Sequence, residues 1–432
     1  MALTSDANEL FQGFSKLSRE ERYQRLIQMG ALSQEDVQYL QDGGIQNLSL
    51  GEKFIENAIG YFQLPMGVAT NFCINDKYYA LPMAVEETSI IAALSKTAKW
   101  INRHGKITTK VEGDCIIGQI QIAHVKNYDR LEEIIGCNES FLIEQVNEEV
   151  ATNMTKRGGG VRSLELRKLT DSFGNIMAVI HVMMNTCDAL GANILNQVLE
   201  YLKAPIENLS NEQVTMCILS NLNTKKMTTA TIILEDIDPE LAMRIESASL
   251  FAESDPYRAA TNNKGVLNGI DPLLIATGND WRAVEAGIHA YAALDGQYRS
   301  ITQWRYENNR LIGNITAPLI VGIVGGVTGL HPTAQMALRM LEVQSADELS
   351  QIIAAAGLVQ NLGAIRALCT EGIIQGHMKL HIDNLTLNSG ANQEESPLLK
   401  NRLEQWLFVH KRVSLTQAKQ LLAKIRQEKA LP

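Results

Sequence analysis

The sequence lacks the features that mark several large classes of protein. Its six cysteines are scattered, without a CxxC pair or a Cys/His cluster at zinc spacing, which indicates reduced thiols in a cytosolic protein. Lysine and arginine form no long block and the net charge is −9, so the chain has no basic footprint for nucleic acid or an anionic membrane. These absences favour chemistry on a small molecule.

Long hydrophobic runs are also missing. The most apolar segments, residues 176–184 and 317–330, are shorter than the roughly 20 residues that a membrane-spanning helix needs. The N-terminal MALTSDANELFQGF is acidic and polar, whereas a signal peptide begins with a basic region and an apolar run. We therefore expect a soluble, cytoplasmic protein with no membrane or nucleic-acid partner.

Periodic patterns predict the order of the elements in the first half. Apolar positions at helical spacing over residues 16–41 predict two short helices, the second capped by Ser33. The order strand, helix, two strands, helix, strand is then predicted over residues 110–125, 128–155, 161–169, 176–184, 189–202 and 214–219, with a turn at 171–174. That order is typical of a ferredoxin-like, split βαβ domain. Residues 114–220 are therefore expected to form a compact insert within a larger domain.

The rest of the chain is predicted to be mainly helical. Alanine, leucine and glutamate are frequent beyond Ala230, and residues 317–324 are a strand candidate. After Gly376 the chain carries a turn-prone NSGANQEESP and a basic helix over residues 415–429, which indicates a mobile terminal unit. The predicted fold class is α+β, with a helix-rich large domain.

The stretch 255–287 has the composition of a site. Lys264 lies between Asn263 and Gly265, and Asp280 comes just before a helix that is predicted to begin near Trp281. Glycines let a backbone approach a ligand closely, and a lysine among few other charges stabilises a developing oxyanion. The residues alone leave open a surface loop with a solvated lysine.

Five segments carry a resemblance to a known family. In chain order they are LPMAVEETSIIAA, DALGAN, NNKGVLNGID, TGNDWRAVEAG and EGIIQGHMKLH. Together they resemble 3-hydroxy-3-methylglutaryl-coenzyme A reductase in its soluble, bacterial class II form, from about Gly51 to His381. The resemblance implies a four-electron reduction of the thioester to mevalonate and coenzyme A by two NAD(P)H, through mevaldehyde. Relatives in animals and yeast carry a membrane anchor before the catalytic region, for which we expect no room here.

The resemblance also implies a division of the chain. Residues 1–113 and 221–375 would form the large domain, residues 114–220 the small dinucleotide-binding domain, and residues 376–432 a flap over the substrate. Glu56–Gly60 resembles the ENxIG signature at the family's subunit contact. A homodimer with active sites at its interface is therefore expected, and a higher oligomer stays open.

Four catalytic residues follow from the resemblance. Lys264 would stabilise the oxyanion of the first hydride transfer, and His377 would protonate the coenzyme A thiolate. Glu87 would donate a proton to the mevaldehyde oxygen, kept protonated by burial and coupled to Asp280 and Lys264. Without the resemblance, a glutamate before an apolar helix is more often a favourable first-turn charge. His377 and His381 lack a third ligand, so no metal is predicted.

Binding residues are implied in the same way. Arg258 would hold the free carboxylate of the substrate, with Ser89, Asn268 and Asn361 as polar neighbours. The expected dinucleotide contacts are Asp188, Leu190, Gly191, Asn193 and Asn221. A GxGxxG fingerprint is absent from any suitable position, which fits a family that binds the dinucleotide through a DAMG-type motif, here with Leu190 in place of methionine. Taken alone, the motif also reads as an ordinary acidic helix start.

The coenzyme and the direction of reaction are less specified. Ala151 stands where NADH-preferring relatives carry an acidic residue, and Lys156 and Arg157 precede three glycines, so NADPH is slightly preferred over NADH. Glu148 and Glu149 lie close enough to weaken that preference. Two alternatives remain: NAD-linked oxidation of mevalonate in carbon catabolism, and a catalytically inactive homologue that serves as a scaffold. The presence of all four catalytic residues argues against the scaffold.

Overall fold

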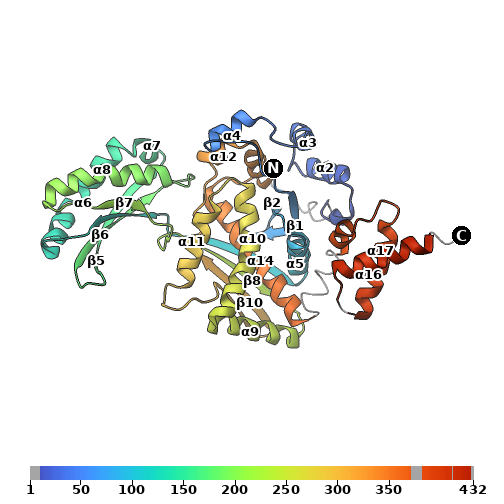
Figure 1. Cartoon of the computed structure of the whole chain (residues 1–432). Coiled ribbons are helices and arrows are strands. Elements are labelled where there is room, and N and C mark those ends of the chain that lie inside the picture. The colour runs from blue at the N-terminus through green and yellow to red at the C-terminus, as the bar shows by residue number, and fades with distance from the viewer. Residues whose placement is uncertain (1–9, 371–381, 411, 430–432) are drawn as a thin grey trace.

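The computed structural model describes residues 10–370, 382–410 and 412–429. Two β-sheets organise this part of the chain, which confirms the predicted α+β class. Figure 1 shows a four-stranded sheet with its helices at one end of the molecule, a six-stranded sheet in the middle, and the C-terminal helices at the other end. Each of these regions has its own cluster of buried apolar side chains.

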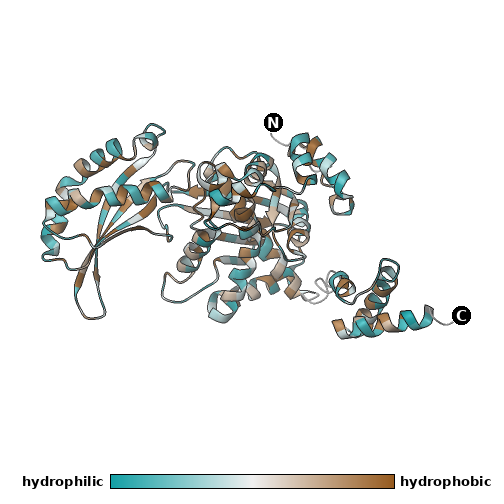
Figure 2. Cartoon of the chain, turned by 45° about the horizontal axis from the view of Figure 1, so that its top comes forward, coloured by the Kyte–Doolittle hydropathy of each residue, from teal (hydrophilic) through white to brown (hydrophobic). Residues whose placement is uncertain are grey.

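The six-stranded sheet has the order β2-β1-β3-β8-β10-β9 and is antiparallel except for the β1–β3 pair. Its strands are β1 (Met66–Ile74), β2 (Lys77–Ala84), β3 (Gly105–Glu112), β8 (Met227–Leu234), β9 (Thr302–Glu307) and β10 (Arg310–Ala317). The sequence patterns did not reveal this sheet. Figure 2 shows that the apolar segments gather around it.

The strand predicted over residues 317–324 is wrong. Strand β10 ends at Ala317, and Pro318, which has no N–H to give to a strand ladder, follows directly. The backbone of the segment finds other partners: the Asn279 side chain bonds both the N–H and the carbonyl of Gly322, and the Ile323 N–H donates to the Asp188 carbonyl. The apolar run is therefore buried as irregular chain between other elements.

Helices cover the six-stranded sheet. They are α5 (Ile90–His104), α9 (Pro239–Ser254), α10 (Pro256–Ala276), α11 (Trp281–Ala292) and α14 (Ala346–Cys369), with α12 (Gly326–Leu330) and α13 (Pro332–Leu341) beside them. Helix α14 packs on β3, β8 and β10 and against α10. It is long and apolar enough to cross a membrane, but 67% of its apolar window is buried inside the protein, as is typical of the core helix of a soluble protein.

Helices α10 and α14 approach closely because of two glycines. A Cβ on Gly269 would lie 2.6 Å from the Ala356 carbonyl oxygen, and one on Gly357 would lie 2.9 Å from the Ile270 side chain. Part of the glycine content of the 255–287 stretch thus serves helix packing. Helix α10 includes Lys264, so the interpretation of this stretch as a surface loop is wrong.

The four-stranded sheet has the order β5-β6-β4-β7 and is antiparallel. Its elements appear in the order predicted for this segment: β4 (Ile116–Ile122), α6 (Tyr128–Glu149), α7 (Thr152–Thr155), β5 (Gly160–Thr170), β6 (Ile176–Asn185), α8 (Ala192–Ser210) and β7 (Met216–Leu219). The helix predicted over 128–155 breaks after Glu149, and the one predicted over 189–202 begins later and extends to Ser210.

One predicted strand is two strands in different sheets. The alternating pattern of residues 110–125 continues across a break at Gly113, where β3 leaves the larger sheet and β4 enters the smaller one. Gly113 has a φ of +75°, and a Cβ there would lie 2.0 Å from the Lys225 carbonyl oxygen. The segment that leads back from β7 to β8 therefore passes directly beside the outgoing one.

The described residues toward both ends of the chain are mainly helical, as predicted. The N-terminal part contains η1 (Phe14–Lys16), α2 (Arg19–Gln28), α3 (Gln34–Gln41) and α4 (Leu48–Phe54), and the C-terminal part contains residues 382–388, α16 (Ser396–His410) and α17 (Leu415–Lys429). Ser33 caps α3 by accepting the Asp36 N–H at 3.0 Å. Helices α16 and α17 pack on each other around a small apolar cluster.

Candidate active site

Helix α10 presents Lys264 to solvent beside Glu87. The Asp255 carboxylate caps the helix by accepting the Arg258 N–H at 2.8 Å, and Pro256 occupies its first position. Lys264 Nζ lies 3.3 Å from Glu87 Oε2, in the turn that precedes α5. The side chains of Lys264 and Glu87 are 64% and 42% exposed, so the burial predicted for Glu87 is wrong. Glu87 is exposed because it lies in an open turn beside a lysine.

A buried amide network lies beneath Lys264. Asn361 of α14 donates to Asn262 Oδ1 at 2.8 Å and accepts the Trp304 indole N–H at 2.8 Å. Asn263 donates to the Arg299 carbonyl and accepts the Ile301 N–H. Satisfied networks of this kind fix a core, because each partner becomes costly to remove. The network anchors α10 to α14 and β9, and it determines which face of α10 carries Lys264.

Arg258, Asn268 and Ser89 were predicted to contact the substrate, and the structure places each of them in different surroundings. Arg258 is half-buried, and its guanidinium makes no hydrogen bond or ion pair to any described residue; burial lowers its pKa from the usual value. Asn268 is half-buried on the same helix. Ser89 has a φ of +76°, an uncommon conformation for a residue with a side chain, at the start of α5. Asn361, by contrast, is 1% exposed and has both amide groups occupied.

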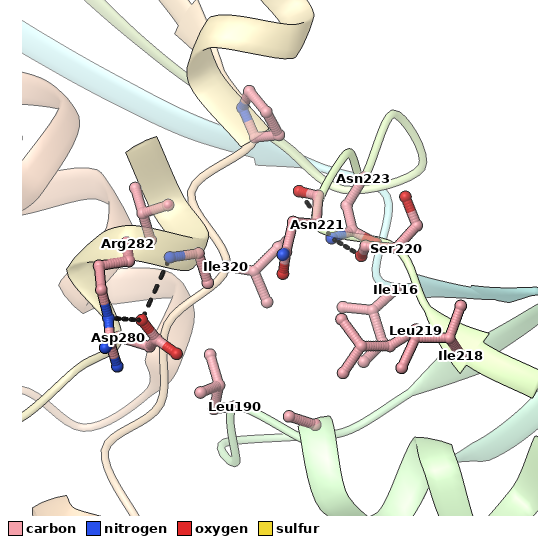
Figure 3. Close-up of a pocket in the computed structure, with 14 residues that line it drawn as sticks. Ile116, Leu190, Ile218, Leu219, Ser220, Asn221, Asn223, Asp280, Arg282 and Ile320 are labelled. Carbon is pink, nitrogen blue, oxygen red and sulfur yellow. Dashed lines mark hydrogen bonds and ion pairs between the residues drawn. The ribbon is translucent and has the colours of Figure 1, made fainter. Parts of the chain in front are cut away.

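Asp280 stands at the start of α11, where the helix was predicted to begin. Its Oδ1 accepts the Ala283 N–H at 3.1 Å and lies 3.6 Å from Arg282 Nε. The carboxyl group faces a pocket of about 420 Å³ (Figure 3). The pocket is lined by Ile116, Leu190, Ala192, Ile218, Leu219, Ser220, Asn221, Asn223, Asp280, Arg282, Ala283, Val284, Pro318 and Ile320. It joins the smaller sheet and the start of α8 to the start of α11.

The DALGAN loop is anchored to the larger part of the molecule. Asp188 Oδ1 accepts the Ala346 N–H at 2.8 Å, at the first residue of α14, and its carbonyl accepts the Ile323 N–H. Asp188 therefore does not start the helix that follows it, and the interpretation as an ordinary acidic helix start is wrong. Ala189 forms an isolated parallel bridge with Val324. Helix α8 begins after the loop, and no side chain caps it.

Gly191 gives the loop its shape. It has a φ of +83°, and a Cβ there would lie 2.2 Å from Thr186 Cγ2. Gly322 faces the loop from the other side, where a Cβ would lie 2.5 Å from the Leu190 nitrogen. These close approaches place Leu190 and Ala192 in the wall of the pocket, with the uncapped start of α8 beside it. Asn193 is exposed and does not line the pocket.

A basic loop lies next to the DALGAN loop. Cys187 Sγ lies 3.6 Å from the Arg157 carbonyl oxygen, and a Cβ on Gly159 would lie 2.6 Å from the Asn185 carbonyl oxygen. The exposed residues Lys156 and Arg157 therefore border the start of α8, while Ala151 is buried. His377 and His381 lie outside the described residues. Within the described ranges, no group of three or more metal-ligating side chains occurs.

Comparison with known proteins identifies the family. The sequence profile of hydroxymethylglutaryl-coenzyme A reductase matches residues 18–382. The chain belongs to this reductase family. The 3-hydroxy-3-methylglutaryl-coenzyme A reductase of Archaeoglobus fulgidus is 38% identical over 418 residues, which cover 96% of this chain and 94% of the relative. A probable reductase of Borreliella burgdorferi is 33% identical over 385 residues, covering 87% of this chain and 86% of the relative.

Solved reductase structures match as well. The Streptococcus pneumoniae reductase has a TM-score of 0.81 and 38% identity, covering 96% of this chain and 99% of that one. The class II reductase of the same organism, bound to NADPH in open conformations, has a TM-score of 0.80 and 38% identity, covering 83% and 100%. The family predicted from the motifs is confirmed, the chain is an oxidoreductase of that family, and the catabolic and scaffold alternatives are not favoured.

Several of the predicted site residues are thus brought together within the described part of the chain. The structure brings Lys264 to Glu87, and it brings Asp280 to Leu190 and Asn221 in one pocket. It places Asp188, Asn193 and Asn361 elsewhere: on the start of α14, on the exposed surface of α8, and in the core. The anchoring role of Asn262 and Asn263 was missed by sequence reasoning, and so was Trp304, which donates to Asn361 in the same network. An amide beside a lysine reads equally as a ligand contact.

Proposed function

We propose that the chain reduces 3-hydroxy-3-methylglutaryl-coenzyme A to mevalonate and free coenzyme A, consuming two NADPH and two protons. The observation that carries the proposal is the pocket that joins Asp280 to the start of α8. A dinucleotide held at α8 and a thioester held at α10 and α11 would meet there. Most of the surface that lines the pocket is apolar, which suits the exclusion of water from a hydride transfer.

The residues around α8 fit a dinucleotide. The uncapped start of this helix offers backbone N–H groups and a partial positive charge to a pyrophosphate, beside Leu190 and Asn221 in the pocket wall. Lys156 and Arg157 border it and are suited to the 2′-phosphate of NADPH, while the buried Ala151 offers no acidic group to a ribose. A related class II enzyme has been solved with NADPH bound. The bound dinucleotide supplies the hydride in each step.

Lys264 is proposed to act in the first reduction. When hydride reaches the thioester carbon, the carbonyl oxygen gains a negative charge that the ammonium group stabilises. Collapse of that adduct breaks the carbon–sulfur bond and releases coenzyme A thiolate, which His377 would protonate. Glu87 and Asp280 would serve the second reduction, in which the aldehyde oxygen takes up a proton. The hydrogen bond between Glu87 and Lys264 is a path by which that proton could be supplied.

Arg258 is proposed to hold the free carboxylate of the substrate. Its guanidinium is half-buried and makes no ion pair with the described residues, so it offers an anion a partly desolvated, bidentate partner. Ser89 and Asn268 are proposed as further polar contacts. Asn361 is proposed to act through the amide network that orients α10, since its side chain is buried and fully bonded.

The arrangement of domains and subunits is also a proposal. The two separate apolar clusters support a large domain of residues 1–113 and 221–375 and a small domain of residues 114–220, and the third cluster supports a flap within residues 376–432. Around the ENxIG segment, Ile59 is 97% exposed and Phe62 is 94% exposed. Such exposed apolar side chains support a homodimer, and a cytoplasmic location is proposed with it.

Coenzyme oxidation tests the proposed function. NADPH and NADH would be supplied separately with the thioester substrate, and free thiol would be measured alongside the loss of coenzyme absorbance. We expect thiol release with both coenzymes, faster with NADPH, and a rate lower by a factor on the order of 10³ from Lys264→Ala. No turnover from folded protein with either coenzyme would refute the proposal, and a strong preference for NADH would refute the role of Lys156 and Arg157.

A further inference from the structure

Two acidic side chains lie near each other where α10 packs against α11, about two helical turns beyond Lys264 on α10. Asp271 lies further along α10, and Glu285 lies on α11, the helix that Asp280 caps. Asp271 Oδ1 is buried and receives no hydrogen bond from any amide, hydroxyl or amine of the described residues. The neighbouring group is the Glu285 carboxyl, which interacts with the Asp271 side chain through its charge and as a hydrogen-bond partner. The two carboxyl groups therefore face each other across the α10–α11 contact.

A contact of this kind requires a proton. Two carboxylates repel each other and neither can donate, whereas one protonated carboxyl donates to its ionised neighbour. Burial first, and the Glu285 charge second, raise the pKa of Asp271 to about 8, while the charge of Lys264 opposes the shift. Glu285 and Lys264 are the charged groups that act on Asp271 within the described chain. Glu87, in contrast, stands in an open turn.

We propose that Asp271 and Glu285 share one proton at neutral pH, and that the resulting hydrogen bond is a positioning device that holds α10 against α11. Lys264 and Asp280 belong to these two helices, so the bond fixes the position of one relative to the other. Loss of the shared proton leaves two negative charges in contact and weakens the α10–α11 packing. The catalytic consequence rests on the proposed reductase function, whereas the shared proton itself does not.

Infrared spectroscopy and thermal unfolding test the shared proton without any turnover. Asp271→Asn keeps a donor to Glu285 and removes the titrating group; Asp295→Asn, at an exposed position after α11, is the charge-matched control. At neutral pH we expect the carbonyl stretch of a protonated carboxyl in the wild type and in the control, and its loss in Asp271→Asn. An unchanged band in Asp271→Asn would overturn the proposal.

The pH dependence of stability gives a second readout. A carboxyl whose pKa is raised on folding stabilises the protein below its unfolded pKa of about 3.9, and this contribution is lost as the pH rises toward the folded value. Because the folded value for Asp271 is about 8, the Tm of the wild type should fall relative to that of Asp271→Asn across this window. The control should follow the wild type. Parallel curves for all three proteins would contradict the shared proton.

Kinetics separate the positioning role from a purely structural one. If loss of the proton disables the site, kcat of the wild type should drop about tenfold between roughly pH 7 and pH 9, and Asp271→Asn and Glu285→Gln should lose much less. Equal losses in all proteins would overturn the positioning role. If no protein turns over, the reductase proposal fails, while the infrared and unfolding results still decide the carboxyl pair.

Discussion

The two sides of the site are held in place by different means. Helix α10 is fixed by side chains: the Asn262–Asn361–Trp304 chain of hydrogen bonds and, as proposed, the contact between Asp271 and Glu285. The DALGAN loop is fixed mainly by backbone, through Gly191, through the approach of Gly322, and through the cap that Asp188 gives to α14. The proposed thioester side therefore depends on buried hydrogen bonds, and the proposed dinucleotide side depends on close backbone contacts that only glycine allows.

This difference predicts which substitutions affect the stability of the protein, which affect its activity, and which affect both. A residue that projects from α10 into solvent should matter to chemistry far more than to stability, because most of its side chain is exposed. A buried amide beneath it should matter to both stability and activity. A loop glycine should matter to coenzyme binding first, because its loss displaces only the loop.

The largest expected effect is on Lys264. Lys264→Ala should lower kcat by a factor on the order of 10³, because it removes the positive charge that is proposed to stabilise the oxyanion. Its side chain is 64% exposed, so the free energy of unfolding should change by less than about 0.5 kcal/mol. Steady-state kinetics and urea unfolding measure the two quantities. A large loss of stability would show that Lys264 supports the fold and would break the comparison.

The buried amide network should show the opposite pattern. Asn361→Ala leaves the Trp304 indole N–H and the Asn262 carbonyl oxygen without partners in the core, which should cost about 1–3 kcal/mol of unfolding free energy. Activity should fall as well, since α10 loses its anchor. Asn268→Ala on the same helix is the control: we expect near-wild-type stability and a raised KM for the thioester. Equal stability of the two variants would mean that the network does not hold α10.

Gly191 tests the backbone side of the comparison. Gly191→Ala introduces a Cβ that would lie 2.2 Å from Thr186 Cγ2, at a φ of +83°, and should raise the KM for NADPH about tenfold while kcat changes less. Gly158→Ala is the matched control, because Gly158 has a φ of +89° and no atom within 4 Å of the added Cβ. A similar KM increase in both variants would assign the effect to backbone strain rather than to the contact with Thr186.

The sequence predicted local features better than the surroundings that place them. The two N-terminal helices, the Ser33 cap, the helix start at Trp281 and the order of elements from β4 to β7 follow from periodicity and capping residues. The strand prediction for residues 317–324 failed because an apolar run resembles a buried strand. In the structure, Asn279 and Asp188, from distant parts of the chain, form hydrogen bonds with the backbone of this segment. Such partners leave no local signal.

The candidate site was also predicted better in its residues than in their surroundings. The motifs identified Lys264, Glu87 and Asp280, but exposure and hydrogen bonding depend on tertiary contacts. Glu87 was expected to be buried and is open, whereas the carboxyl group with a buried oxygen is that of Asp271, beside Glu285. Each belongs to a segment that reads locally as a helix with an ordinary surface charge. Only the packing of α10 on α11 brings them together.

The smallest expected effect lies in the choice of coenzyme. Lys156→Ala combined with Arg157→Ala should raise the KM for NADPH about threefold and leave that for NADH unchanged, since only NADPH carries the 2′-phosphate that these exposed cations are proposed to bind. The NADPH effect should shrink at high salt, because both side chains are exposed. Lys203→Ala, at an exposed position further along α8, is the control and should affect neither coenzyme. An equal increase for both coenzymes would mean that this loop shapes the dinucleotide site as a whole, and the dinucleotide side would then depend on charge as well as on close backbone contacts.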